Sequence, residues 1–211
     1  MMTLWVMSSE VMKHGSTNTT LKRSSQVHNG RLPIPHDQKK FRQSKSRVKI
    51  MLLTFFDNRG YVHYEFVLTG QTVNQVYYLE VLERLREKVR RKRPELFANN
   101  SWILHHNNAP AHIALSVSKF LATKQITVLE HPAYSLDLDP NYIFLFLKIK
   151  EILKGRHFDD IDDIMSNTTA ALKAIPQNQF QNCFEGWTRH WHRCIASQGE
   201  YFEGDYGGIQ Q

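Results

Sequence analysis

The chain has 211 residues, 41% of them hydrophobic and 22% charged, which fits one globular domain with a sizeable core. Its formal net charge of +7 predicts a surface that attracts polyanions such as nucleic acids. No apolar run reaches the roughly 18 residues of a membrane-spanning helix, and the N-terminus does not resemble a signal peptide, so we expect no membrane partner.

The N-terminal part of the chain is mostly polar. Residues 4–7 predict a short strand, and the stretch 8–47 is rich in Ser, Asn, Gln, Lys and Arg. A polar segment of this length next to a compact domain is usually functional or disordered. We therefore divide the chain into residues 1–47, a residual first strand with a basic arm, and residues 48–211, the core.

The core begins with two β-rich runs. The apolar run 48–57, the turn at 58–60 and the run 61–68 predict a β-hairpin. Because the first run is apolar on both faces, we expect it to be a central strand covered by helices on both sides. Asp57 in the turn is interpreted as a turn-capping residue.

Helices and strands then alternate. A helix is predicted from Thr72, with apolar residues at 4-3-4 spacing and an end at Pro94. A strand at 102–106, a helix at 112–124, a strand at 126–131 and helices at 141–153, 160–174 and 177–197 follow. This order predicts an α/β fold, with a mixed sheet flanked by helices and a helical C-terminal part.

The last predicted helix carries an aromatic stripe and both cysteines. The stripe, which includes Trp187 and Trp191, is interpreted as core packing, with base stacking as the alternative. Cys183 and Cys194 lie roughly 16 Å apart along such a helix, too far for a disulfide. The Cys183, His190, His192 and Cys194 set lacks zinc-finger spacing, and residues two apart on a helix point to different faces, so we predict no zinc site.

The stretch 102–112, WILHHNNAPAH, is a predicted strand that delivers polar groups to its end. Polar groups at the ends of central strands are typical of two-metal nuclease cores. The segments VKIMLLTFFDNRGYVHYEF, SWILHHNNAPAH, AYSLDLDPNYIFLF, LKGRHFDDIDDI and FQNCFEGWTRHWHRCIASQGEYFEGDY resemble the catalytic domain of mariner-family (Tc1/mariner) transposases, and also the transposase-derived part of SETMAR-type proteins.

This resemblance implies an RNase H-like fold and a site where three aspartates hold two divalent ions. Carboxylates suit this role because closely spaced dications need anionic oxygen ligands. In this sequence the matching positions hold Met2, Asn107 and Tyr142. Thirty-four residues separate Asn107 from Tyr142, the spacing that the family uses. All three acidic positions have thus lost their acid.

Two nearby carboxylates are weak candidates for rescuing the site. Asp137 and Asp139 precede Tyr142 by five and three residues, but one carboxylate cannot hold two dications. We therefore predict no metal ligands and no cofactor, with Mg²⁺ or Mn²⁺ required if any activity remains. Whether the chain is an enzyme stays open at this point, and the loss of the acids predicts inactivity.

Basic residues predict contacts to DNA. The resemblance makes residues 1–47 a clamp-like arm that contacts a partner subunit, although Val27 stands where a Trp is usual. Cations in the last turn of a helix stabilise that helix, so the basic run at 90–93 can have a purely structural role. The alternatives are that it binds phosphates or serves as a nuclear targeting signal. The candidate phosphate-binding residues are Lys39, Lys40, Arg42, Lys45, Arg47, Arg90, Arg91, Lys92 and Arg93.

The sequence therefore predicts a degenerate or domesticated mariner transposase catalytic domain that binds DNA nonspecifically without cleaving or transferring strands. The alternatives are an active, metal-dependent transposase or endonuclease with a rescued site, and a relic without function. We expect DNA and a second copy of the chain as partners, no small-molecule substrate and, from the family, a nuclear location. We also expect the chain to lack the helix-turn-helix modules that read transposon ends.

Overall fold

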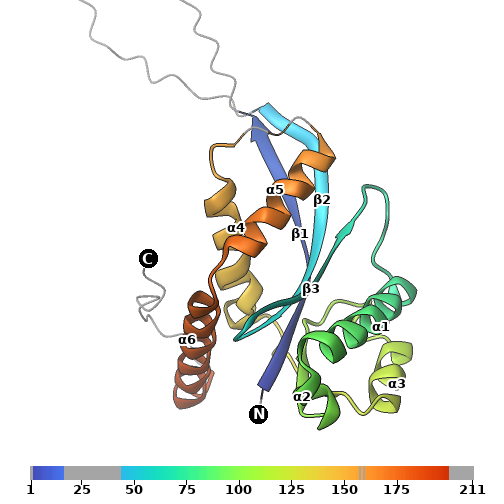
Figure 1. Cartoon of the computed structure of the whole chain (residues 1–211). Coiled ribbons are helices and arrows are strands. Elements are labelled where there is room, and N and C mark those ends of the chain that lie inside the picture. The colour runs from blue at the N-terminus through green and yellow to red at the C-terminus, as the bar shows by residue number, and fades with distance from the viewer. Residues whose placement is uncertain (1, 17–43, 157, 159, 200–211) are drawn as a thin grey trace, which may run out of the picture.

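The computed structural model describes residues 2–16, 44–156, 158 and 160–199, which build a mixed sheet with helices on both faces (Figure 1). The five strands are arranged in the order β3-β2-β1-β4-β5. β1 pairs antiparallel with β2 and parallel with β4, which in turn pairs parallel with β5. The strands are β1 (Met2–Ser16), β2 (Ser44–Asp57), β3 (Gly60–Val67), β4 (Trp102–His105) and β5 (Thr127–Leu129).

The helices form two groups that cover opposite faces of the sheet. One group contains α1 (Gln75–Lys92), α2 (Pro94–Ala98) and α3 (Leu115–Thr123). The other contains α4 (Phe146–Leu153), α5 (Ile161–Ala174) and α6 (Gln177–Ala196), preceded by the short helical turns η1 (Leu136–Leu138) and η2 (Asn141–Leu145). The predicted mixed α/β fold with a helical C-terminal part is confirmed.

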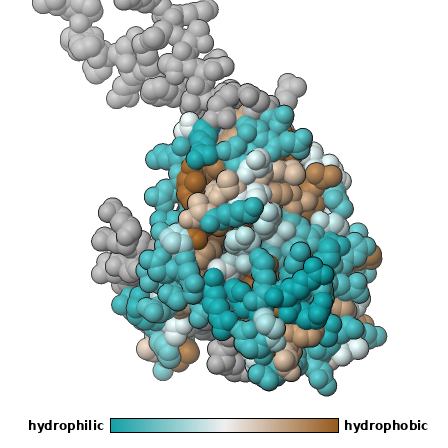
Figure 2. Space-filling model, viewed as in Figure 1, coloured by the Kyte–Doolittle hydropathy of each residue, from teal (hydrophilic) through white to brown (hydrophobic). Residues whose placement is uncertain are grey.

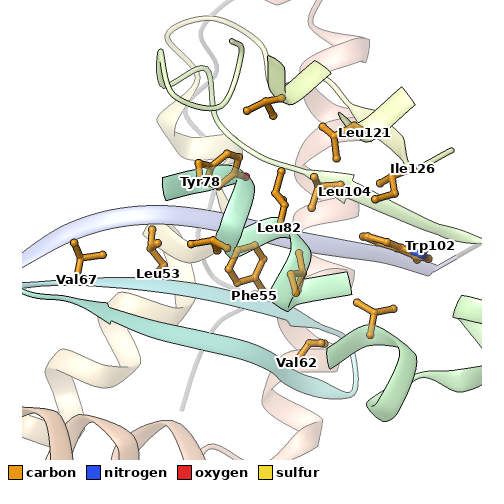
Figure 3. Packing of buried hydrophobic residues seen from close by; sticks show 14 residues of the cluster. Leu53, Phe55, Val62, Val67, Tyr78, Leu82, Trp102, Leu104, Leu121 and Ile126 are labelled. Carbon is orange, nitrogen blue, oxygen red and sulfur yellow. The ribbon is translucent and has the colours of Figure 1, made fainter. Parts of the chain in front are cut away.

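The second strand is buried on both faces, as predicted for a central strand. Leu53 and Phe55 join the apolar cluster under α1 and α3, which Figure 3 shows from close by. Leu52 and Phe56 point the other way, into the cluster under α4, α5 and α6. Because successive side chains of a strand point to opposite faces, this single run supplies both cores.

The boundaries of the first helix group differ from the sequence prediction. α1 begins at Gln75 rather than Thr72, because the side chain of Asn74 caps it by accepting a hydrogen bond from the Tyr77 N–H at 2.9 Å. Pro94 ends α1 as predicted, but it also occupies the first turn of α2, a helix that the sequence analysis missed. α3 begins at Leu115 rather than 112, since residues 109–113 form a turn.

The first strand is longer than the predicted 4–7 and runs to Ser16. It lies in the middle of the sheet, and β2 begins at Ser44, so the proposed division at residue 47 falls inside a strand that pairs with β1. Most of the basic arm, including Val27, lies outside the described residues. α5 and α6 match their predicted ranges to within one residue at each end.

The hairpin turn carries a buried ion pair. The Asp57 carboxylate accepts a hydrogen bond from the Arg59 N–H at 2.8 Å, which is the predicted turn-capping role. It also accepts two from the Arg93 guanidinium, at 2.7 and 2.9 Å, and its side chain is only 1% exposed. This bidentate pair fixes the end of α1 to the hairpin, and removing one partner would leave the other charge uncompensated.

The visible surface is largely hydrophilic, with separate apolar areas (Figure 2). Within the described residues, no helix has both the length and the apolar character needed to cross a membrane.

Candidate functional site

Asn107 lies two residues beyond the end of β4 and organises the turn that follows. Its side-chain Oδ1 accepts a hydrogen bond from the Ala109 N–H at 3.2 Å, and its carbonyl oxygen accepts one from His112 Nδ1 at 3.3 Å. Asparagine commonly caps a turn in this way. The amide oxygen is therefore already engaged in local structure, and it brings no negative charge to the strand end.

Three aromatic rings stack beside this turn. The ring of His112 lies 4.0 Å from that of Tyr78 and 5.4 Å from that of His106, measured between centroids. The Tyr78 hydroxyl and His106 Nδ1 form a hydrogen bond of 3.0 Å. All three side chains are buried, and burial lowers the pKa of His106 to about 4 and that of His112 to about 3.

A second histidine pair lies at the neighbouring strand end. His105 Nδ1 donates to the Leu129 carbonyl of β5 at 3.0 Å, and its Nε2 accepts from His131 Nδ1 at 3.1 Å. Burial, with a smaller contribution from His131, lowers the pKa of His105 to about 3. Asn108 Nδ2 donates to the His131 carbonyl at 2.8 Å, which ties the two loops together. These histidines are neutral at physiological pH.

The segment that contains Tyr142 starts from a buried polar network. Asp139 is 2% exposed, and its Oδ1 accepts a hydrogen bond from the Asn141 N–H at 3.1 Å. The Asn141 side chain accepts one from Thr54 Oγ1 of β2 at 2.9 Å, which anchors η2 to the central strand. Burial raises the pKa of Asp139 to about 7, whereas Tyr142 itself lies on the surface.

The strand pairing places Met2 away from this strand end. Met2 pairs with Trp102 at the start of β4, and Trp5 pairs with His105 at its end. Asn107 lies five residues after Trp102, about 16 Å along the strand direction at ~3.3 Å per residue. In this register the backbone of Met2 is not adjacent to Asn107, so the three matched positions do not converge.

The residues at the matched positions do not fit a two-metal centre. Asn107 offers a neutral amide and Tyr142 a phenol, whereas paired dications require carboxylates. Asp139 is buried, which raises its pKa to about 7, and Asp137 is hydrogen-bonded to His190. Among the His, Cys, Asp and Glu side chains of the described ranges, the three potential metal ligands that lie together are Asp137, His190 and Cys194.

The basic run at the end of α1 is engaged within the molecule. Arg90 and Arg91 both pair with Glu87, and Arg93 forms the buried pair with Asp57. Lys92 lies over the ring of Tyr61 at 4.2 Å, and burial lowers its pKa. The candidates Lys39, Lys40 and Arg42 lie outside the described residues, while Lys45 and Arg47 lie in β2.

Comparison with known proteins identifies the family of this site. The chain is 33% identical to the Mos1 transposase catalytic domain in its structure with raltegravir and Mg, with a TM-score of 0.69 over 74% of this chain and 78% of that one. The chain belongs to the mariner transposase family. A model described as "Transposase (partial DDE domain)" also matches residues 17–98.

The chain matches less than half of the length of two related proteins. It is 32% identical to the Mariner Mos1 transposase of Drosophila mauritiana over 74% of the chain, which spans 45% of that protein. It is 25% identical to the human histone-lysine N-methyltransferase SETMAR over 74% of the chain and 23% of that protein. The Mos1 paired-end complex with the left transposon end matches 94% of the chain with a TM-score of 0.73 and 29% identity, and 56% of that chain is covered.

Sequence reasoning missed several residues that shape this site. Tyr78 lies in the apolar stripe predicted for α1, and that pattern does not indicate that its ring stacks on His112. His131 and Thr54 lie far in sequence from their partners His105 and Asn141, so no local pattern indicates these pairs.

The buried histidines are expected to make the folded protein less stable at acidic pH. The pKa values of His105, His106 and His112 in the folded state lie below the ordinary value of 6.5, so the unfolded state binds more protons below that pH. Their stabilising contribution is complete above pH 6.5 and is lost as the pH falls toward 4. We expect each histidine to contribute up to ~1.4 kcal/mol per pH unit to this loss, as measured by urea unfolding. A His112→Phe variant should show a shallower acid loss, and an unchanged slope would contradict this assignment.

Asp139 is expected to make stability depend on pH in the opposite direction. Its folded-state pKa of about 7 lies above the ordinary 3.8, so its contribution to stability is complete below pH 3.8 and is lost as the pH rises through 7. Between pH 5 and pH 8, an Asp139→Asn variant should therefore gain up to about 3 kcal/mol relative to the parent chain. The comparison of the two pH values cancels any packing cost of the amide. A difference that does not change with pH would show that Asp139 is ionised in the folded protein.

Proposed function

We propose that this chain is a mariner transposase catalytic domain that has lost strand cleavage and strand transfer and that binds DNA nonspecifically. The observation that carries the proposal is the chemistry of the matched positions, where Asn107 and Tyr142 supply no negative charge. Activation of water or of a DNA 3′-hydroxyl by two divalent ions needs several carboxylates around the ions. The strand end instead holds neutral histidines and an amide that caps a turn.

A rescued site is the main rival proposal, and the local contacts argue against it. Asp139 is buried and burial raises its pKa to about 7, so the side chain would have to become accessible before it could bind a cation. Asp137 is half-exposed but faces His190. Asp137 and Asp139 make separate contacts within the protein. They therefore do not replace the three carboxylates that would hold two divalent ions.

DNA binding is supported by charge. The net charge of +7 favours phosphate contacts, and several of the cations lie in the arm at 39–49. Arg90 and Arg91 are 53% and 65% exposed, and surface ion pairs such as theirs with Glu87 are weak, so both can exchange to phosphate. Arg93 is held by Asp57, so we propose no DNA contact for it. Binding of this kind is independent of base sequence.

One of the similar solved structures is a paired-end complex of the Mos1 transposase with the left transposon end. This supports DNA as a partner of the present chain. We further propose that two copies associate on DNA and that the chain acts in the nucleus, both from family membership. The rival view, a relic without function, makes the same prediction for cleavage but not for binding. DNA binding therefore separates these two proposals.

The cleavage proposal is tested with supercoiled plasmid DNA in Mg²⁺ or Mn²⁺. We expect no nicking above the level seen with EDTA, because the metal-binding carboxylates are absent. The double variant Asn107→Asp/Tyr142→Asp should also be inactive, since the first position near Met2 still lacks an acid. Metal-dependent nicking by the parent chain would overturn the proposal, and its loss in Asp137→Ala or Asp139→Ala would assign the activity to a rescued site.

The binding proposal is tested by fluorescence anisotropy with duplexes of unrelated sequence over a range of salt concentrations. We expect similar affinities for all duplexes, and log K should fall linearly with log salt by about 0.9 per phosphate contact. Neutralising Lys39, Lys40 and Arg42 to Gln should lower the slope. Lys119→Gln and Lys124→Gln, which remove charge from α3 and from its C-cap, serve as controls. If the chain does not bind DNA even at low salt, the result would contradict the binding proposal and support the view that the chain is a relic without function.

A further inference from the structure

A second group of metal-binding side chains lies where η1 meets α6, outside the matched acidic positions. Asp137 comes from η1, and His190 and Cys194 come from α6. One carboxylate oxygen, one ring nitrogen and the sulfur all lie within 4.8 Å of one another. His190 Nε2 and Asp137 Oδ2 are already 2.9 Å apart.

The secondary structure explains why these three side chains meet. His190 and Cys194 are four residues apart on a helix, so they share one face. One turn earlier on α6, Trp187 Nε1 donates to the Leu138 carbonyl at 2.9 Å. This bond fixes η1 against α6 at the residue next to Asp137 without using any of the three side chains. The arrangement is thus held in place before any ion arrives.

We propose that Asp137, His190 and Cys194 form a zinc site in which water is the fourth ligand. Imidazole nitrogen, thiolate sulfur and carboxylate oxygen are the three donor types that zinc accepts, and Mg²⁺ has little affinity for the sulfur. Zinc–ligand distances of about 2.0–2.3 Å place tetrahedral donors roughly 3.3–3.6 Å apart. The present donors lie within 4.8 Å of one another, so zinc binding requires side-chain rotations that bring them closer together.

Proton balance is simple at this site. Zinc binds the thiolate and the unprotonated Nε2 of a neutral imidazole. The Cys194 thiol therefore releases one proton to solvent, and the Nε2 proton that His190 donates to Asp137 moves through solvent to Nδ1. The His190–Asp137 hydrogen bond is replaced by two bonds to the ion. Asp137 and His190 are 46% and 22% exposed at the side chain, which leaves an entry path and room for the water. No oxidation or reduction is involved.

The inference departs from the prediction made from the helix alone. Along α6, the residues His190, His192 and Cys194 do not make a site, because His192 points to another face. The missing ligand is Asp137, 53 residues before His190, and only the packing of η1 on α6 supplies it. A bound ion cross-links α6 to the loop that leads from β5 into η2, and so holds the segment that precedes Tyr142.

The test is zinc binding by the full chain in competition with a chromophoric chelator. We expect one tight zinc equivalent, and at least ~100-fold weaker binding in Cys194→Ser, His190→Gln and Asp137→Asn, because each removes a direct ligand. His192→Gln, an exposed histidine on the same helix, is the matched control and should retain affinity within about 2-fold, since it touches no ligand.

Two further measurements keep the result interpretable. Co²⁺ should give a thiolate charge-transfer band in the parent chain and in His192→Gln, and no such band in Cys194→Ser, although Cys183 remains in its buried place. Zinc should raise the melting temperature of the parent and of His192→Gln only, and circular dichroism without metal confirms that each variant folds. The proposal is overturned if zinc does not bind, if the three ligand variants bind as well as the parent, or if His192→Gln loses binding equally. None of these readouts depends on DNA binding or on cleavage.

Discussion

The burial of β2 on both faces constrains the rest of this molecule, because one run of alternating side chains feeds both apolar clusters. Leu53 and Phe55 hold α1 and α3, whereas Leu52 and Phe56 hold the C-terminal helices. The polar positions of the same strand are used as anchors: Thr54 ties down η2 and Asp57 ties down the end of α1. The strand ends that carry the candidate site are positioned by these contacts.

Desolvation determines the charge of that candidate site. The histidines at the end of β4 are neutral because burial lowers the pKa of each, and burial raises the pKa of Asp139 to about 7. Without bound dications, a cluster of ionised carboxylates in this place would be unfavourable. The neutral amide of Asn107 avoids that cost and caps the turn. The strand end that carries Asn107 is therefore folded and locally hydrogen-bonded.

The junction of η1 with α6 has a different chemistry. Trp187, predicted as core packing with base stacking as the alternative, donates to the Leu138 carbonyl, and its ring lies 6.4 Å from that of His105. It thereby links α6 both to the strand-end histidines and to the loop that carries Asp137. The proposed zinc site would strengthen a link that the protein already makes through the indole, and it uses ligands that a magnesium-dependent site would not select.

The sequence by itself determined the order of most strands and helices, the central place of β2, and the neutral side chains at Asn107 and Tyr142, because hydrophobic period, turn residues and side-chain chemistry are local properties. It also identified Asp57 as a turn residue. It did not indicate the Asn74 cap, the short helix after Pro94 or the full length of β1, whose extent depends on pairing with β2 and β4. Tertiary structure alone decided that Arg93 is held by Asp57, that Met2 pairs at the far end of β4 from Asn107, and that Asp137 lies beside His190. Each of these depends on contacts between residues far apart in the chain, and no local pattern encodes which distant partner a side chain will meet.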